Sequence, residues 1–337
     1  MTEPPLDALI HACLPPLKAH RAGSLDAARE RLDALPGAAD ASVVVATLIG
    51  QEQALQGELQ RDPRIATQRF APHDWPLLLY LCFSLFYRDD LPRRPTFHRM
   101  ASLLLAAGAD PGAYFMCGDE KETALYAATG VANDAVLGAM LLDAGADVDD
   151  EDAAYHIAEH DSCEAIELLF RRGLREDLRV TTLLHKLDSE DVEGVRTVLD
   201  LGVDPNAQGR WGKTALHQAI MRGRSMSMLQ LLLDRGANVN ALRDDGKSPY
   251  ALAARIGRDE VMRLLIAHGA DTTLSPGDEF LAACGSGDQG RADAARARVS
   301  AFSEEDQVAL VDAARDGKTR AVEMMLNGDM PVDARGA

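Results

Sequence analysis

The stretch that decides the fold is residues 209–241, which read GRWGKTALHQAIMRGRSMSMLQLLLDRGANVNA. Apolar residues recur in it at helical spacing, first over 216–220 and again over 228–233. Thr214 precedes the first apolar series, where its side-chain oxygen can accept a hydrogen bond from an amide of the first helical turn. Gly236 follows the second series, where a helix commonly ends in a left-handed residue. The stretch therefore predicts two short helices followed by a projecting loop, which we call a finger.

A second copy of this stretch begins at Asp244 and reads DDGKSPYALAARIGRDEVMRLLIAHGADT. Ser248 stands 34 residues after Thr214, and Gly269 stands 33 residues after Gly236. Helices of about two or three turns do not persist alone in water, so neighbouring copies must cover their apolar faces. The repeat therefore predicts a stack of helix pairs whose stability is collective.

The chain resembles the ankyrin-repeat proteins in two motifs. Residues 214–217 (TALH) are similar to the family's T-P-L-H-x-A-A pattern, and residues 232–240 (LLDRGANVN) to its L-L-x-x-G-A-D-x-N pattern. Weaker copies occur at 123–126, 182–185, 108–110, 145–147 and 202–204. The resemblance implies an all-α solenoid of stacked helix-turn-helix pairs with projecting loops.

We expect the flanks of this array to be less regular than its centre. The chain is expected to divide into divergent N-terminal repeats or a cap at 1–69, the ankyrin-repeat core at 70–276, and degenerate C-terminal repeats or a cap at 277–337. An insertion rich in Arg and Pro, at about 87–97, separates the helices of the repeat that opens at 75–83 (WPLLLYLCF). This layout also resembles a group of bacterial ankyrin-repeat proteins.

The charge of the chain is strongly acidic and unevenly spread. The 337 residues include 35 Lys plus Arg and 53 Asp plus Glu, for a formal charge of −18. This balance opposes general binding to nucleic acid or anionic membranes. Residues 110–204 carry 7 basic and 23 acidic side chains, whereas residues 210–263 carry 10 basic and 5 acidic ones. Nucleic-acid binding through the positive segment is therefore a hypothesis that ranks below protein binding.

Targeting and redox signals point to a cytoplasmic protein. The first residues include Glu3, Asp7 and several prolines, where a signal peptide needs basic residues and an unbroken apolar run. No stretch approaches the roughly 20 apolar residues of a membrane span. The five cysteines lie far apart without C-x-x-C spacing, as in a reducing compartment. We expect a cytoplasmic chain that is monomeric by itself.

Two short motifs suggest catalysis or a cofactor. Residues 156–160 (HIAEH) match the H-x-x-E-H pattern of zinc hydrolases, but the repeat register places His156 at the histidine of T-P-L-H and His160 at an exposed inner-helix position. Residues 285–290 match G-x-G-x-x-G, but they follow the predicted helix EFLAAC where a dinucleotide site needs a strand. We therefore expect no enzyme, cofactor or metal, with a metal-dependent hydrolase at 156–160 as the alternative.

The resemblance implies that fingers and the exposed side of the first helices bind a partner. Aromatic, Met and Arg side chains are enriched at interface anchors. The candidate contacts are Tyr114, Phe115, Met116, Arg210, Trp211, Gln218, Met221, Arg222, Arg243 and Arg255. The alternative is that Trp211 packs on a neighbouring element and that Tyr114 and Phe115 lie under their finger.

The leading hypothesis for function is a non-catalytic module that binds another protein through this concave surface. A sharper alternative is an immunity or inhibitor protein that blocks a toxin or hydrolase, because an acidic surface steers a basic target toward it. The sequence does not name the partner.

Overall fold

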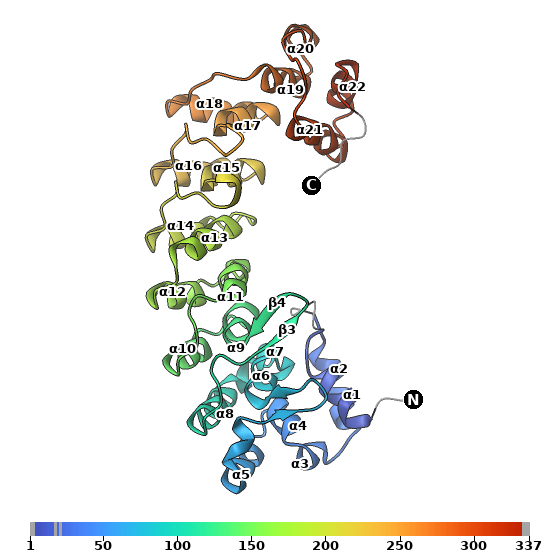
Figure 1. Cartoon of the computed structure of the whole chain (residues 1–337), viewed down its shortest axis with the longest axis vertical. Coiled ribbons are helices and arrows are strands. Elements are labelled where there is room, and N and C mark those ends of the chain that lie inside the picture. The colour runs from blue at the N-terminus through green and yellow to red at the C-terminus, as the bar shows by residue number, and fades with distance from the viewer. Residues whose placement is uncertain (1–3, 17–18, 20–21, 332–337) are drawn as a thin grey trace. The chain divides into compact units, whose positions relative to one another are not determined.

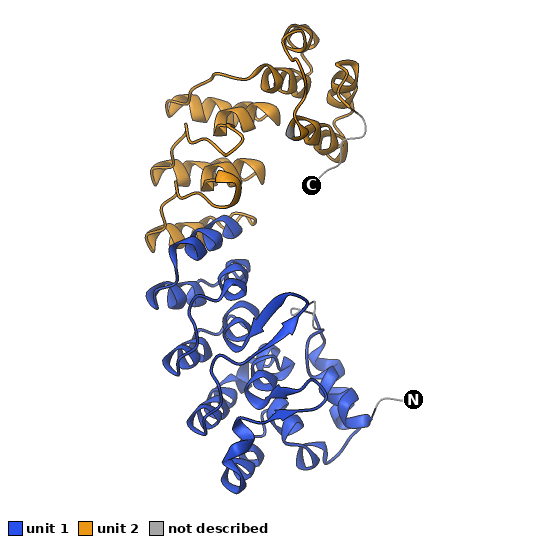
Figure 2. Ribbon diagram, viewed as in Figure 1, with its two compact units in different colours: residues 1–186 blue, residues 187–337 orange. Residues whose placement is uncertain are grey.

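The computed structural model describes residues 4–16, 19 and 22–331. The chain forms two compact units, residues 1–186 and residues 187–337 (Figure 2). Each unit is built from short helices that follow one another in pairs along the chain (Figure 1). The expected all-α solenoid of stacked helix-turn-helix pairs is confirmed. The unit boundary falls inside segment 70–276, and the three-part division of the chain stays a prediction.

The first unit contains many short helices and two small hairpins. Its helices are α1 (Pro5–Ala12), α2 (Leu25–Asp33), α3 (Ala38–Ala41), α4 (Val43–Leu48), α5 (Glu52–Arg61), α6 (Leu77–Cys82), α7 (Leu85–Asp89), α8 (Arg94–Ala106), α9 (Ala124–Tyr126), α10 (Ala135–Asp143), α11 (Glu151–His156), α12 (Glu164–Arg171) and α13 (Glu176–Lys186). Its shorter helical turns are η1 (Pro63–Ala66), η2 (Leu91–Arg93), η3 (Ala127–Val131) and η4 (Ile157–Glu159). Its antiparallel hairpins pair β1 (Arg69–Phe70) with β2 (Trp75–Pro76) and β3 (Tyr114–Cys117) with β4 (Glu120–Thr123).

The core of the first unit is centred on α6, whose six residues are all buried. α4 and α8 pack against α6. α7 and η2 stand between α6 and α8, where the sequence predicts the insertion at 87–97. Tyr87 and Phe97 are fully buried, with ring centroids 5.7 Å apart. The insertion is therefore fixed to the core at both of its ends.

The second unit continues the helix pairs. Its elements are α14 (Val192–Asp200), η5 (Arg210–Gly212), α15 (Ala215–Met221), α16 (Met226–Asp234), α17 (Pro249–Arg255), α18 (Asp259–Ala267), α19 (Pro276–Ser286), α20 (Gln289–Arg296), α21 (Glu304–Arg315) and α22 (Thr319–Asn327). The first helices α15, α17 and α19 pack on one another in succession, and each also packs on the second helix of its own pair. α21 and α22 pack on α19 around Phe280, Leu281 and Met325.

The local signals in residues 209–241 form the structure that the sequence predicts. Thr214 and His217 make a capping box at the start of α15, in which the Thr214 amide donates to His217 Nδ1 at 3.2 Å. Leu216 and Ile220 are fully buried against the stack. Gly236 follows α16 with φ 85°, a left-handed conformation that costs other residues roughly 1–2 kcal/mol. These predictions are confirmed.

Two other motif assignments were wrong in register. Thr182 does not cap a helix, because it lies inside α13 and its hydroxyl donates to the carbonyls of Leu178 and Ala154. Asp150 caps α11 by accepting from the Ala153 amide, so His156 is the last residue of that helix and not the histidine of the capping motif. In this part of the chain, the helices therefore begin at other residues than those that match the family motif.

No helix in the described ranges is long and apolar enough to cross a membrane.

Candidate functional site

The β3–β4 hairpin presents two apolar side chains to solvent. Tyr114 is 44% exposed and Met116 is 55% exposed, whereas Phe115 between them is buried. This alternation follows from strand geometry, which points successive side chains to opposite faces. The Lys121 ammonium lies 4.4 Å from the centroid of the Tyr114 ring. The hairpin therefore carries an exposed face of aromatic, thioether and cationic groups.

The opposite face of the hairpin is fixed by aromatic packing. Phe115 stacks on Trp75 with ring centroids 4.3 Å apart, and Phe83 meets Phe115 edge-on at 5.2 Å. Trp75 is itself buried and comes from β2. Phe115 was predicted as a candidate partner contact, but the structure places its ring in the interior, where it joins the two hairpins.

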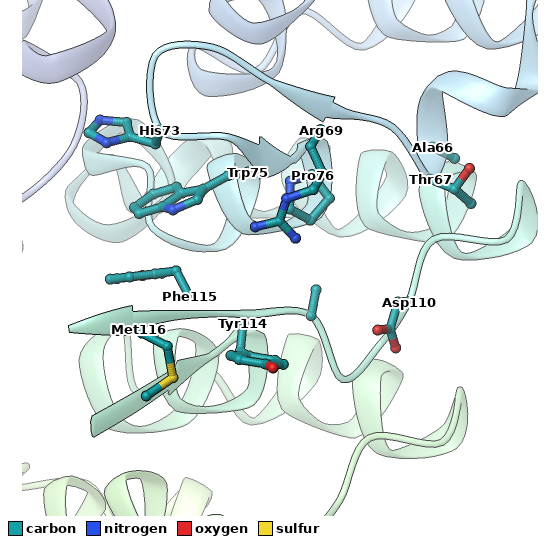
Figure 3. Close-up of a pocket in the computed structure, with 11 residues that line it drawn as sticks. Ala66, Thr67, Arg69, His73, Trp75, Pro76, Asp110, Tyr114, Phe115 and Met116 are labelled. Carbon is teal, nitrogen blue, oxygen red and sulfur yellow. The ribbon is translucent and has the colours of Figure 1, made fainter. Parts of the chain in front are cut away.

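An open groove of about 530 Å³ separates these two hairpins. We call it the aromatic groove, and Figure 3 shows its lining side chains. Trp75 and Pro76 line it from β2, and Tyr114, Phe115 and Met116 line it from β3. Its polar lining includes Arg69 and Asp110. The groove therefore has an apolar floor with single charges at its edges.

A second groove, of about 440 Å³, lies on the β4 side of the same hairpin. We call it the acidic groove, because its charged lining residues are Asp119, Glu120, Lys121, Asp147, Asp149, Asp150, Glu151 and Asp152. Burial raises the pKa of Asp150, and burial followed by the charge of Asp150 raises that of Asp152. Glu122 on β4 has its pKa raised to about 8, first by burial and then by Asp152, Glu120 and Asp150. A cationic group would relieve this crowding of carboxylates.

The finger of the second unit exposes a tryptophan. Trp211 is 56% exposed and has φ 61°, an uncommon conformation for a bulky residue. The Arg210 guanidinium lies 4.3 Å from its ring centroid, and the Lys213 ammonium lies 5.2 Å away. The indole thus lies close to two cations and is more than half exposed to solvent.

A pocket of the second unit brings three of the predicted residues together. Met221, Arg243 and Arg255 line a pocket of about 200 Å³, together with Ile256. Arg243 Nη1 lies 3.3 Å from the sulfur of Met221. Met221 and Ile256 are exposed, and the charged side chains that line this pocket are of both signs, because Asp312 and Asp316 also line it.

Two predicted residues of the second unit are buried in polar networks. Gln218 donates from Nε2 to Asp188 Oδ1 at 2.6 Å, and the exposed Arg222 donates from Nε to the same oxygen at 2.6 Å. Arg255 donates to carboxylates of Asp278 and Asp306, each at 2.8 Å. Burial of Gln218 and Arg255, like that of Phe115, leaves the other seven predicted residues as the more accessible candidates.

The histidine motif at 156–160 serves contacts within the chain. His156 Nδ1 lies 3.2 Å from Glu159 Oε1, and His185 Nε2 lies 3.1 Å from the same oxygen. His160 instead directs Nε2 at the carbonyl oxygen of Gly130, at 2.7 Å. Across the described part of the chain, no three His, Cys, Asp or Glu side chains are grouped to hold a metal ion.

The glycine motif at 285–290 spans the end of α19 and the start of α20. Gly287 ends α19 with φ 73°, so the glycines form the tight turn between paired helices, as predicted. Sequence reasoning missed Lys121 on the exposed face of the hairpin, and it missed the buried Trp75 and Glu122 that lie behind that face. The excess of 23 acidic over 7 basic residues in 110–204 was the signal for the acidic groove.

Comparisons with known proteins agree with this architecture. A family model described as ankyrin repeats (3 copies) matches residues 184–275. The chain is 45% identical over 102 residues to Protein PhlB of Serratia liquefaciens, a match that covers 30% of this chain and 44% of PhlB. It is 32% identical over 178 residues to human Ankyrin repeat and SOCS box protein 6. This match covers 42% of this chain and 42% of that protein. The chain thus spans less than half the length of these curated relatives.

Among solved structures, the human ASB11 ankyrin repeat domain is similar in fold, with a TM-score of 0.53 and 23% identity. The match covers 68% of this chain and 98% of that domain. The chain therefore contains ankyrin repeats, and its fold is that of an ankyrin-repeat domain. Ankyrin repeats form a general protein-protein interaction module.

Proposed function

We propose that this chain binds a partner protein without catalysis, through its fingers and the exposed side of its first helices. The observation that carries this proposal is the exposure of Tyr114 and Met116 on a hairpin whose intervening residue, Phe115, is anchored in the core. A rigid support under exposed aromatic and thioether side chains lowers the entropy cost of binding. Such side chains are also the ones that concentrate binding energy in interfaces.

The second unit offers a surface of the same kind. Trp211 and Leu242 are exposed on its fingers, and Met221 and Ile256 are exposed on its first helices. Arg210, Arg222 and Arg243 are the other predicted contacts of this unit that are not buried. We propose these residues as the second contact surface, with Trp211 as the main anchor.

The acidic groove favours one of the alternative functions as a second candidate. Its seven acidic lining residues suit a partner with a basic surface. That charge would steer a basic toxin or hydrolase toward an immunity or inhibitor protein that blocks it. In this case the partner's activity falls in proportion to the complex formed, whereas a scaffold leaves the activity unchanged.

The test compares exposed apolar residues on the fingers with exposed apolar residues on the second helices. The test variants are Tyr114→Ser with Met116→Ser, and Trp211→Ser. The matched controls are Val136→Ser on α10 and Ile266→Ser on α18, which are 56% and 49% exposed. We expect the finger variants to reduce partner recovery in affinity purification at least tenfold and the controls to leave it within twofold. Equal recovery by all four proteins contradicts the proposal.

A further inference from the structure

We propose that the partner inserts an extended, basic segment into the aromatic groove, where the segment pairs as an added strand with the open edge of β3. This inference rests on the proposed function and specifies how the partner is held. It assigns the recognition to the backbone of β3 as well as to its side chains.

The register of the hairpin shows which backbone groups of β3 are turned away from β4. Ala113 stands opposite Ala124, and the Ala124 amide donates to the Ala113 carbonyl at 2.9 Å. Hydrogen-bonded and non-hydrogen-bonded pairs alternate along an antiparallel ladder. Tyr114 with Thr123 and Met116 with Lys121 are therefore non-hydrogen-bonded pairs. The amides and carbonyls of Tyr114 and Met116 point to the other edge of the strand.

That other edge faces the aromatic groove. β3 belongs to a two-stranded sheet, so no described strand besides β4 pairs with it. Tyr114 and Met116 line the groove on this side, and Trp75 and Pro76 of β2 line it on the other (Figure 3). Pro76 has no amide hydrogen to donate, so a segment in the groove finds its fuller set of partners on β3.

The dimensions of the groove suit one extended segment. β3 has four residues, so a paired segment covers roughly 13 Å at about 3.3 Å per residue. The stacked rings of Trp75 and Phe115 form a closed floor beneath it. Strand addition of this kind draws affinity from main-chain hydrogen bonds and specificity from alternate side chains.

The charge of the surroundings selects the chemistry of the segment. The acidic groove flanks the same hairpin on its β4 side, with seven acidic lining residues and Lys121. Arg69 at the edge of the aromatic groove is paired with Asp74, its Nε lying 3.1 Å from Asp74 Oδ2. Lys121 over Tyr114 shows that the exposed ring accepts a cation on its face. The paired residues of such a segment lie in the aromatic groove, where a Lys or Arg at an alternate position can meet the Tyr114 ring, and only its flanks reach the acidic groove, where further Lys or Arg residues would meet carboxylates.

The experiment selects a displayed library of random dodecapeptides on the immobilised full-length chain, and the strongest binders are then synthesised. We expect basic peptides of alternating pattern to be enriched. In such a peptide, every second amide pairs with β3 and the amides between them point away. N-methylation of the pairing set should weaken binding at least tenfold, and N-methylation of the other set should change the affinity less than threefold. Met116→Pro in the chain should weaken binding at least tenfold, whereas Met116→Val, which keeps the amide, should not.

The outcomes separate this inference from the function it rests on. Absence of enriched peptides, enrichment of acidic ones, or equal effects of both N-methylated sets overturns the strand pairing. The N-methyl comparison decides the question even if Met116→Pro fails to fold. If the pairing fails while Tyr114→Ser with Met116→Ser still abolishes partner recovery, the proposed function stands and binding uses side chains alone. If the peptides pair but the serine variants retain the partner, the proposed function fails instead.

Discussion

The indole of Trp75 stacks on the phenyl ring of Phe115, with planes inclined by 24° and centroids 4.3 Å apart. Trp75 lies in the second strand of the first hairpin, and Phe115 lies in the first strand of the second. Both rings are buried, so the contact fixes the distance between the hairpins and forms the floor of the aromatic groove. The exposed residues beside Phe115 owe their positions to this stack.

Truncation of the stack should destabilise the first unit. Phe115→Ala removes a buried ring and should cost ~3–5 kcal/mol of unfolding free energy. Tyr114→Ala, one residue away on the exposed face, should cost less than about 0.5 kcal/mol. Urea titration of both variants checks this contrast. Equal losses at the two positions contradict the assignment of the hairpin faces.

The buried ion network of the second unit gives a second prediction. Arg255 bridges Asp278 and Asp306, which lie in the first turns of α19 and α21. Arg255→Met leaves two buried carboxylates without this partner and should cost ~3–5 kcal/mol. Arg222→Met, which removes a more exposed pair with Asp188, should cost less than about 1 kcal/mol. Thermal unfolding of the two variants at neutral pH measures the difference.

His217 should make the second unit lose stability in acid. Burial lowers its pKa to about 4 from the ordinary 6.5. Between these two values the imidazole is protonated in the unfolded chain and neutral in the folded chain. The free energy of unfolding therefore falls as the pH drops from about 6.5 to about 4. The loss should approach ~2–3 kcal/mol, and His217→Gln, which can keep the capping hydrogen bond, should remove it. A variant that retains the full acid dependence contradicts this role.

Glu122 should make the first unit less stable as the pH rises, which is the opposite of the effect of His217 on the second unit. Its folded pKa is raised to about 8 from 4.5, so stability is greatest below pH 4.5 and falls as the pH rises through 8. Glu122→Gln should therefore be more stable than the parent chain above pH 8, and this advantage should shrink toward pH 4. Melting temperatures of both proteins across this range provide the test. A glutamine variant that is less stable at pH 9 contradicts the raised pKa.

Sequence reasoning succeeded where the signal was local. The capping box of Thr214 and His217 and the left-handed Gly236 are each decided within one or two helical turns, and both are present. The TLLH motif at 182–185 failed because its threonine hydroxyl bonds to carbonyls within and beside α13 instead of capping it. A threonine before a leucine does not by itself show where a helix begins.

The candidate surface was predictable only in part. Tyr114, Phe115 and Met116 are all apolar, so the sequence gives no polar-apolar alternation that shows which face is buried. The register with β4 and the contact with Trp75 decide it, and both depend on residues outside the motif. The burial of Gln218 and Arg255 was not predictable for a similar reason, because their acidic partners come from neighbouring helix pairs.

Site-specific photocrosslinking tests the central claim most directly. Benzoylphenylalanine placed at position 114, 116 or 211 should form covalent adducts with the same partner protein in cells. The same reagent at 136 or 266, on the second helices, should give at least tenfold less of that adduct. Adducts that form mainly at 136 and 266, or equally at all five positions, would contradict a partner surface built on the fingers.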